Sequence, residues 1–484
     1  MVDDAGTRSP LRYGVVRGAG SLQTWEGRCL EVLDASGLAV RVADGSQHEA
    51  PDLDFVLCFG GGDPPLASAN GARVGAWRFF FGEPPRYGDG PPLFWEVFDG
   101  AAVAGVRLER VDPGGQRFLL KQGFVSITGL TLARARERVR AEVARWPTDA
   151  CRALLAGAPD RPTVEVQAPA SLRVPTPFDS VALVFKIAWR SLWGTIKLFS
   201  TERWSIGVVD APIQSFLSDA TLLRVAWLPE PLDATYFADP FAVYADGRRW
   251  LFAEQYDIKR RQGRISALAL DGPPIDRGPQ PAICANGHLS YPFVFSRDGE
   301  IYCIPESLDE NEVALYRAIE IPQRWEKHAV LLTGNWVDAT PLEHGGRFWL
   351  FCTEFAGLRH HRLHAFYADA LAGPYHPHAL NPIKIDPRSS GGAGTPFVHG
   401  GTLFRPSQDC SRAYGGSITI NRVLELTPTS FAEEPAATVL PRKDGPFPDG
   451  IHTLSALGDR TYVDGKRREF TLKRVLWRLR KLFK

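Results

Sequence analysis

Short apolar segments, separated by turns rich in glycine and proline, recur along most of the chain and predict β-strands. In the N-terminal third they lie at residues 13–16, 55–59 and 77–81. A helix is predicted at 131–147, where apolar residues alternate with arginine and glutamate at helical spacing. Strands followed by a helix are typical of an α/β fold, so we expect a small α/β domain over residues 10–155.

A connector is expected over residues 156–200. Its first part is rich in proline, valine and threonine, which is typical of a linker. Residues 178–199 predict an amphipathic helix with Lys186, Arg190 and Lys197 on one side. Two interpretations stay open: the helix packs between two domains, or it binds a membrane surface or a partner protein.

Residues 201–470 contain an internal repeat, which is the strongest pattern in the chain. Each repeat consists of an apolar strand, a turn with glycine or Asp-Gly, and a second apolar strand. Equivalent positions are separated by 52, 49, 55 and 58 residues and are occupied by Pro240, Pro292, Pro341, Pro396 and Leu454. A period of about 50 residues with two visible strands is typical of a β-propeller, so we expect an all-β propeller with five blades.

Carboxylates recur at one place in this repeat. Glu254 and Glu306 follow their reference prolines by 14 residues, and Glu354 follows its own by 13. Because the first strand of each blade lines the axis of a propeller, we expect these groups to converge there with Asp239 and Asp338. Further candidate contacts, whose arginines would favour an anionic sugar or a phosphate-bearing glycan, are His288, Tyr291, Arg388, Arg405 and His452.

Converging carboxylates are the groups that glycoside chemistry requires. One carboxyl group acts as an acid and a second acts as a base or nucleophile across the glycosidic bond. Crowding raises the pKa of one of them and keeps it protonated at neutral pH. Two other interpretations stay open: the glutamates cap blade hairpins by accepting backbone N–H bonds, or the site binds a ligand without chemistry.

The segments FADPF, SYPFVF, IPES, WVDATP and the closing HTLS and VDGKR resemble the N-terminal β-propeller domain family of glucosamine inositolphosphorylceramide transferase. That propeller is similar in architecture to the five-bladed glycoside hydrolases of family 43. Those enzymes draw an Asp base or nucleophile, an Asp that tunes a pKa and a Glu acid from separate blades. The resemblance implies these roles for Asp239, Asp338 and Glu306, respectively, and leaves Glu254 and Glu354 as sugar contacts.

The segments DLDFVLCFGGG and GARVGAWRFFFGEPPRYGDG resemble the core of a formyltransferase domain. That family uses an Asn-x-His motif on a strand, in which the histidine relays a proton. Here Arg78 stands at the Asn position and Phe80 at the His position, and phenylalanine cannot move a proton. We therefore expect a formyltransferase-like α/β domain that is inactive. The alternative is an active sugar N-formyltransferase that uses tetrahydrofolate.

Composition narrows the class of protein further. The chain has 56 Lys and Arg against 55 Asp and Glu, so we expect no nucleic-acid partner. Seven scattered cysteines without a CxxC pair predict reduced thiols and no zinc site. We interpret the HHxxH cluster of His360, His361 and His364 as a solvated loop, and we expect no metal and no cofactor. The absence of a secretory signal and of a long apolar run predicts a cytoplasmic location.

Residues 471–484 predict a basic amphipathic helix with six Lys and Arg residues. An anionic membrane attracts such a helix by about 1 kcal/mol per basic residue near its surface. Two interpretations stay open: the tail binds the inner face of the membrane, or it docks against the helix at 178–199.

These patterns predict a carbohydrate-active or carbohydrate-binding protein whose propeller processes a sugar or glycolipid in surface-glycan metabolism. The chemistry would be of the glycosidase or glycosyl-transfer type. The alternative is a non-catalytic scaffold that recruits a glycan or a partner glycosyltransferase at the membrane.

Overall fold

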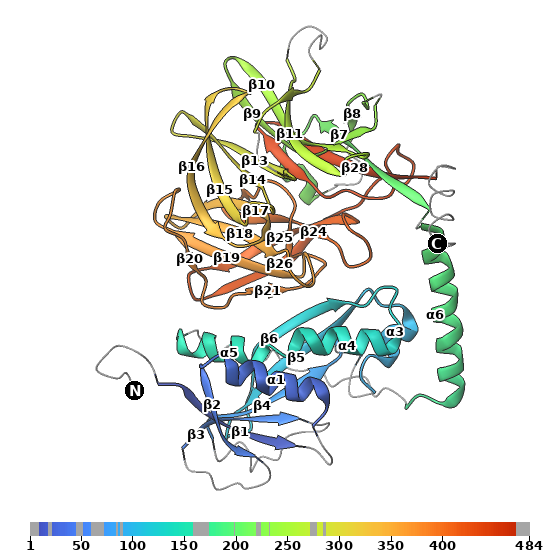
Figure 1. Cartoon of the computed structure of the whole chain (residues 1–484), viewed down its shortest axis with the longest axis vertical. Helices are drawn as coiled ribbons and strands as arrows, with labels where there is room; N and C mark the ends of the chain where they lie inside the picture. The colour runs from blue at the N-terminus through green and yellow to red at the C-terminus, as the bar shows by residue number, and fades with distance from the viewer. Residues whose placement is uncertain are drawn as a thin grey trace. The chain divides into compact units, whose positions relative to one another are not determined.

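The computed structural model describes residues 9–17, 22–44, 52–59, 72–83, 86–87, 91–157, 174–197, 199–218, 224–231, 233–271, 278–283 and 287–470. The chain divides into two compact units, Met1–Gly194 and Thr195–Lys484 (Figure 1), and each is described by itself. The predicted linker lies almost entirely outside the described residues, and the predicted tail helix at 471–484 lies outside them as well. In the described part of the chain, no helix is long and apolar enough to cross a membrane.

The first unit is an α/β domain built on one six-stranded sheet with the strand order β2-β1-β3-β4-β5-β6. The first four strands are parallel neighbours, whereas β5 and β6 are added antiparallel. The predicted strands at 13–16, 55–59 and 77–81 are confirmed as parts of β1, β3 and β4. The strands are β1 (Leu11–Arg17), β2 (Ala39–Asp44), β3 (Leu53–Phe59), β4 (Ala72–Phe81), β5 (Val103–Val111) and β6 (Arg117–Ser126).

Five helices accompany this sheet in the described residues of the first unit, namely α1 (Thr24–Ala35), α3 (Phe94–Asp99), α4 (Leu132–Val143), α5 (Trp146–Leu155) and α6 (Pro177–Lys197). The single helix predicted at 131–147 is wrong in its C-terminal bound, because α4 ends at Val143 and α5 begins at Trp146. The side chain of Thr131 caps α4 by accepting the N–H of Arg134. Pro147 lies in the first turn of α5, where its missing N–H costs no hydrogen bond.

The formyltransferase-like identity of this unit stays a prediction. Arg78 and Phe80 both lie buried on β4, and the guanidinium of Arg78 lies 4.5 Å from the ring centroid of Phe80. The guanidinium of Arg107 lies 5.2 Å from the same centroid. Phe80 stands at the position where that family needs a histidine, and its ring is packed against two cations.

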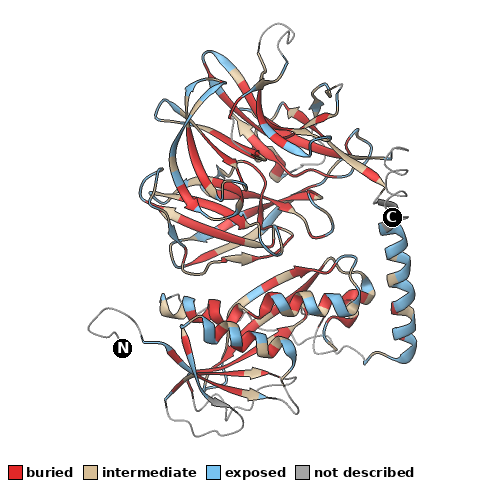
Figure 2. Cartoon of the chain, viewed as in Figure 1, coloured by how far each residue is buried: buried red, intermediate tan, exposed pale blue. Residues whose placement is uncertain are grey.

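Helix α6 exposes most of its large apolar side chains (Figure 2), whereas Leu183 is buried. Arg190 donates to the carbonyl oxygens of Val97 and Phe98 at the C-terminal end of α3, with distances of 2.6 and 2.9 Å. A cation at the C-terminus of a helix is favourable because the last carbonyl groups lack helical partners. The helix thus contacts its own unit through a cation. Its exposed large apolar side chains are Phe178, Val181, Val184, Phe185, Trp189, Leu192 and Trp193.

The second unit is the predicted propeller, and its five blades are confirmed as five antiparallel sheets in the described residues. Blade 1 consists of β9 (Thr235–Ala245), β10 (Arg248–Asp257), β11 (Gln262–Ala269) and β12 (Gln280–Pro281). Blade 2 consists of β13 (Ser290–Arg297), β14 (Glu300–Glu306), β15 (Glu312–Glu320) and β16 (Arg324–Thr333). Blade 3 consists of β17 (Trp336–His344), β18 (Arg347–Glu354), β19 (Arg362–Ala368), β20 (His376–Pro377) and β21 (Lys384–Ile385).

The ring of blades is closed by strands from both ends of the unit. Blade 4 consists of β22 (Gly391–Gly392), β23 (Phe397–His399), β24 (Thr402–Asp409), β25 (Ser417–Leu426) and β26 (Phe431–Val439). Blade 5 has the strand order β27-β28-β7-β8, from β27 (Leu454–Leu457), β28 (Arg460–Phe470), β7 (Ser200–Val209) and β8 (Ala226–Trp227). Strands β28 and β7 pair along ten residues, so backbone hydrogen bonds join the two ends of the propeller.

Candidate functional site

A cavity of about 530 Å³ lies where the first strands of the blades converge. Six of the residues predicted for the site line it, namely Asp239, Glu254, His288, Glu306, Asp338 and His452. Aromatic side chains form much of the remaining wall, with Trp204, Tyr236, Tyr256 and Tyr414. A pocket with convergent polar groups and aromatic walls is typical of a small-molecule site.

A repeated backbone distortion marks the first strands of blades 1 to 3. Asp239, Tyr291 and Asp338 have positive φ angles of 51°, 44° and 54°, a conformation that costs energy in residues other than glycine. At each of these positions the pairing with the second strand of the blade is interrupted. Bulges of this kind redirect side chains and are common beside functional sites. The sequence repeat therefore includes a backbone irregularity as well as a strand.

Backbone N–H groups of these distorted positions bind carboxylates around the axis. The N–H of Asp239 donates to Asp464, and the N–H of Tyr291 donates to Asp239, both at 3.2 Å. The N–H of Asp338 donates to Oε2 of Glu306 at 3.1 Å. Glu306 therefore accepts a backbone bond, as the capping interpretation requires, while its side chain also lines the cavity.

The carboxyl groups in the cavity are protonated to different degrees at neutral pH. Burial raises the pKa of Glu306 to about 8, and the negative charge of Asp338 adds to the shift. Burial also raises the pKa of Asp239 to about 6, an increase that the positive charge of His452 opposes. At pH 7 Glu306 is mainly protonated and Asp239 mainly ionised, which is the division of roles that an acid and a base need. Burial also raises the pKa of Glu254.

His452 lies between two buried carboxylates. Its Nδ1 atom is 2.5 Å from Oδ2 of Asp464, and its Nε2 atom is 3.6 Å from Oδ1 of Asp239. The indole of Trp204 stacks on the imidazole with 4.0 Å between the ring centroids. Among the described residues, Asp239, His452 and Asp464 are the group whose spacing would also suit a metal ion. In the structure His452 pairs with one of these carboxylates on each side of its ring.

Glu354 does not share the place of Glu254 and Glu306, which corrects the expectation of three equivalent glutamates. Glu254 pairs with Ala238, and Glu306 pairs with Ser290. Both partners, Ala238 and Ser290, lie one residue before a distorted position. In blade 3 the corresponding residue, Val337, pairs with Thr353. Glu354 is thus one residue further along, and a shift of one residue moves a side chain to the opposite face of a strand.

The surroundings of Glu354 fit this different position. Oε2 of Glu354 accepts a bond from Arg362 at 2.9 Å, and Oε1 lies 3.0 Å from Nε2 of His364. Although burial opposes the shift, the hydrogen bond and charge of His364 together with the charge of Arg362 lower the pKa of Glu354 to about 2. Glu354 is not among the residues that line the cavity.

Tyr291, Arg388 and Arg405 also lie outside the cavity lining. The hydroxyl of Tyr291 accepts the N–H of Gly394 at 2.8 Å and lies 3.0 Å from Oγ1 of Thr340, so this ring is part of the packing beneath the site. Arg388 donates to the carboxylate of Asp386 at 2.8 to 3.1 Å.

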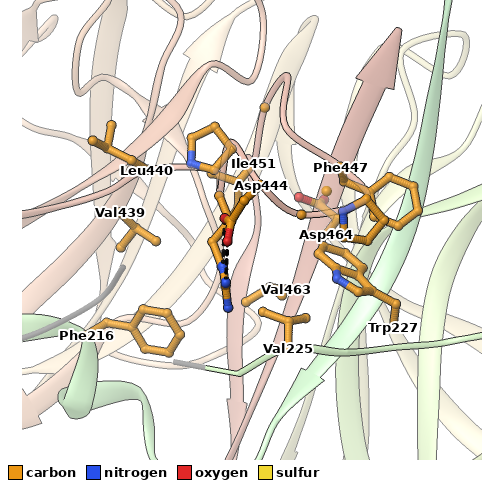
Figure 3. A pocket seen from close by; sticks show the side chains of 16 residues that line it. Phe216, Val225, Trp227, Val439, Leu440, Asp444, Phe447, Ile451, Val463 and Asp464 are labelled. Carbon is orange, nitrogen blue, oxygen red and sulfur yellow. Dashed lines mark hydrogen bonds and ion pairs between the residues drawn. The ribbon is translucent and has the colours of Figure 1, made fainter. Parts of the chain in front are cut away.

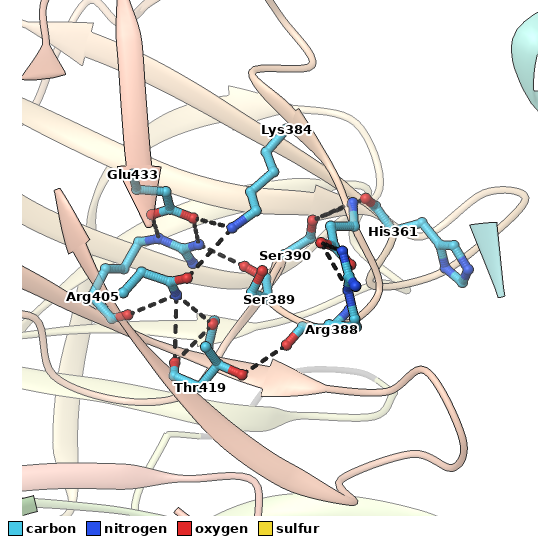
Figure 4. A network of polar contacts seen from close by, with 11 residues as sticks. His361, Lys384, Arg388, Ser389, Ser390, Arg405, Thr419 and Glu433 are labelled. Atoms are coloured by element: carbon cyan, nitrogen blue, oxygen red, sulfur yellow. Dashed lines mark hydrogen bonds and ion pairs between the residues drawn. The ribbon is translucent and has the colours of Figure 1, made fainter. Parts of the chain in front are cut away.

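Arg405 is buried in a network of polar contacts in blade 4 (Figure 4). Its guanidinium donates to both carboxylate oxygens of Glu433, at 3.0 and 2.6 Å, and Lys384 donates to the same carboxylate at 2.6 Å. A buried carboxylate that is shared by two cations is a structural feature of the blade interior. Arg388 and Arg405, predicted as sugar contacts, are therefore each paired with a carboxylate of the protein instead, which corrects that prediction.

His360 lines the cavity, although the sequence analysis interpreted its cluster as a solvated loop. Its side chain is 12% exposed, and its Nδ1 atom lies 3.2 Å from Oδ2 of Asp338. His361 and His364 are buried elsewhere in blade 3. The signal that could have identified His360 is its position on the loop that follows the second strand of blade 3, at the same end of the blade as Asp338.

A second pocket, of about 280 Å³, lies between blades 4 and 5 and has a largely apolar lining (Figure 3). The rings of Trp227 and Phe447 lie 4.4 Å apart in its wall, and Phe216, Val225 and Val463 complete that wall. It contains none of the residues predicted for the site.

Fold and site together define a five-bladed β-propeller with a carboxylate-lined cavity on its axis. The resemblance predicted from its motifs is confirmed for residues 227–444, which match the family model described as glucosamine inositolphosphorylceramide transferase 1, N-terminal. A curated protein of this name from Arabidopsis thaliana is 34% identical over 212 residues, and one from Oryza sativa subsp. japonica is 33% identical over 208 residues. Each alignment covers 42% of this chain, but the chain spans only 27% and 28% of the length of these relatives.

Solved structures with low sequence identity are also similar to the propeller. A thermostable family-43 glycoside hydrolase shares 13% identity over 47% of this chain and 84% of its own, with a TM-score of 0.35. An exo-β-1,3-galactanase from Clostridium thermocellum shares 14% identity over 44% of this chain and 53% of its own, also with a TM-score of 0.35.

Proposed function

We propose that the central cavity of the propeller binds a sugar or the sugar part of a glycolipid and cleaves or transfers a glycosidic bond. The observation that carries this proposal is the pair of carboxyl groups, Glu306 and Asp239, whose pKa values burial raises to about 8 and about 6 in one cavity. The curated relatives are named glucosamine inositolphosphorylceramide transferase 1, which supports carbohydrate as the ligand class.

Glu306 acts as the general acid in this proposal. Its protonated carboxyl group donates a proton to the oxygen that leaves the anomeric carbon. Asp239 acts as the base or nucleophile, since His452 opposes the rise of its pKa and keeps it ionised at neutral pH. Asp338 supplies the negative charge that adds to the raised pKa of Glu306. Glu254 and His288, which lie 3.5 Å apart in the cavity wall, contact sugar hydroxyl groups.

The proposal is tested by incubating the full chain with a panel of p-nitrophenyl glycosides and glycosylated lipids. We expect release or transfer of at least one sugar by the wild type and a fall of about 100-fold or more in Asp239→Asn. Binding of a sugar without turnover of any substrate would contradict the catalytic part and favour the scaffold alternative.

A membrane-associated role is a second proposal, and the exposed side chains of α6 support it. Phe185, Trp189 and Trp193 are 71%, 62% and 53% exposed. Aromatic side chains are favoured at the interface between lipid and water. We expect the full chain to sediment with anionic vesicles and the double variant Trp189→Ser, Trp193→Ser to sediment several-fold less. Equal sedimentation of both proteins would contradict a role of α6.

A further inference from the structure

His360 and Asp338 form a close pair inside the central cavity. Nδ1 of His360 lies 3.2 Å from Oδ2 of Asp338, and the two side chains are 12% and 7% exposed. The same carboxylate oxygen accepts the amide of Gln408 at 3.2 Å. Asp338 is therefore held by a hydrogen bond from blade 4, and the ring of His360 lies beside it from the loop after β18.

The chain leaves room for this ring at a specific point. A Cβ atom at Gly391 would lie 3.0 Å from Nδ1 of His360, which is closer than most contacts of that kind. His360 itself has a positive φ of 58°, a strained conformation for a residue with a side chain. Backbone strain and a glycine opposite the ring both serve to place one imidazole beside one carboxylate.

We propose that His360 is a positioning residue of the sugar site, which fixes the place of the Asp338 carboxylate. The effect on sugar binding rests on the proposed function, whereas the pairing of the two side chains does not. The charge of Asp338 acts on Glu306 and Asp239, so the place of this carboxylate matters for both groups.

Other titratable groups also face the pair. The ring of Tyr414 lies 5.4 Å from that of His360. The groups that experience the charge of Asp338 include Asp239 on β9, Tyr291 on β13, Glu306 on β14, Cys352 on β18, Cys410 and Tyr414 after β24, and His452 before β27. Because Asp338 is the carboxylate within 4 Å of the His360 ring, its removal has a larger effect on that ring than the removal of a more distant group.

The pairing is tested by recording the histidine ring signals of the full chain by NMR after selective ¹⁵N labelling. The signal of His360 is assigned as the one lost in His360→Gln. In Asp338→Asn we expect the ring signals of His360 to move, because the carboxylate 3.2 Å from its Nδ1 atom becomes a neutral amide. Asp309→Asn is the matched control, because Asp309 contacts the backbone of His288 and acts on the His288 ring. It should weaken proton binding by His288 and leave His360 unchanged.

Gly391→Ala adds a variant that changes no titratable group. The added methyl group displaces the ring by a few tenths of an ångström, so we expect a smaller change of the His360 ring signals than in Asp338→Asn. Unchanged ring signals of His360 in both Asp338→Asn and Gly391→Ala would overturn the pairing.

The functional consequence is tested with the sugar that binds best in the panel. His360→Ala leaves Gln408 as the side chain that holds Asp338 and should weaken sugar binding about fivefold or more, whereas the amide of His360→Gln should restore most of the loss. Equal affinity of wild type and His360→Ala would overturn the positioning role. If the wild type binds no sugar, the proposed function fails, and the ring signals of His360 still decide the pairing.

Discussion

The Nδ1 atom of His452 lies 2.5 Å from Oδ2 of Asp464, and both side chains are buried. Although burial opposes the shift, the negative charges of Asp464 and Asp239 raise the pKa of His452. The imidazolium form is thus favoured next to Asp239 and counteracts the rise of the Asp239 pKa. Asp464, which lies outside the cavity lining, therefore acts through the imidazole of His452 on Asp239, which lies inside it.

Replacing His452 with glutamine removes this positive charge. We expect the pKa of Asp239 to rise above about 6, so the acidic limb of the pH profile for turnover should move to higher pH. The measurement is the rate against pH for wild type and His452→Gln. An acidic limb at the same pH in both proteins would show that Asp239 is not the group that must be ionised.

Glu306→Gln should separate binding from chemistry. The amide keeps the shape of the side chain but cannot donate the acid proton, so kcat should fall about 100-fold or more while sugar affinity stays within about twofold. Glu354→Gln is the matched control, since Glu354 lies in the next blade, outside the cavity lining. Loss of turnover in Glu354→Gln but not in Glu306→Gln would contradict the assignment.

The raised pKa of Glu306 also affects stability. Because the pKa is about 8 in the folded protein and near 4.5 in the unfolded chain, the folded state binds more protons between these values. The contribution of Glu306 to the free energy of unfolding therefore falls as the pH rises from about 4.5 to about 8. Relative to wild type, Glu306→Gln should be about 3 to 4 kcal/mol more stable at pH 8 than at pH 5, measured by denaturant unfolding. An equal difference at both pH values would refute this.

Arg405 is expected to matter for folding rather than for the ligand. Arg405→Ala leaves the buried Glu433 with Lys384 as its remaining cation and should cost about 3 to 5 kcal/mol. Arg388→Ala removes a partly exposed pair with Asp386 and should cost about 1 kcal/mol or less. Denaturant unfolding measures both values. Neither change should alter sugar affinity in the folded protein, and a selective loss of affinity in Arg405→Ala would reverse this interpretation.

The number of blades was predictable because each blade leaves a local mark, an apolar strand followed by a turn and a second strand. Convergence of Asp239, Glu254, Glu306 and Asp338 followed from the same repeat. The position of Glu354 could not be predicted in this way. In blade 3 the residue that directly follows the distorted position is Ala339, and the reference proline, Pro341, lies two residues beyond it. A spacing counted from the wrong residue assigns a side chain to the wrong face.

Other features had no local signal in the sequence. The pairing of β28 with β7 joins residues more than 250 positions apart. Arg405 pairs with Glu433 on another strand, and Lys384 binds the same carboxylate, so the sequence around Arg405 does not show that this arginine is paired. His360 depends on a backbone turn with positive φ and on the space left by Gly391, both of which only the folded chain reveals.

Binding of simple sugars to the full chain, followed by ligand-detected NMR, tests the central claim most directly. We predict that at least one sugar of a monosaccharide and glycolipid-headgroup panel binds. We also predict that Asp239→Asn and His288→Ala each weaken the binding of this sugar about fivefold or more, while Glu354→Gln does not. Binding that is insensitive to the cavity variants, or no binding by the wild type, would contradict a sugar site on the propeller axis.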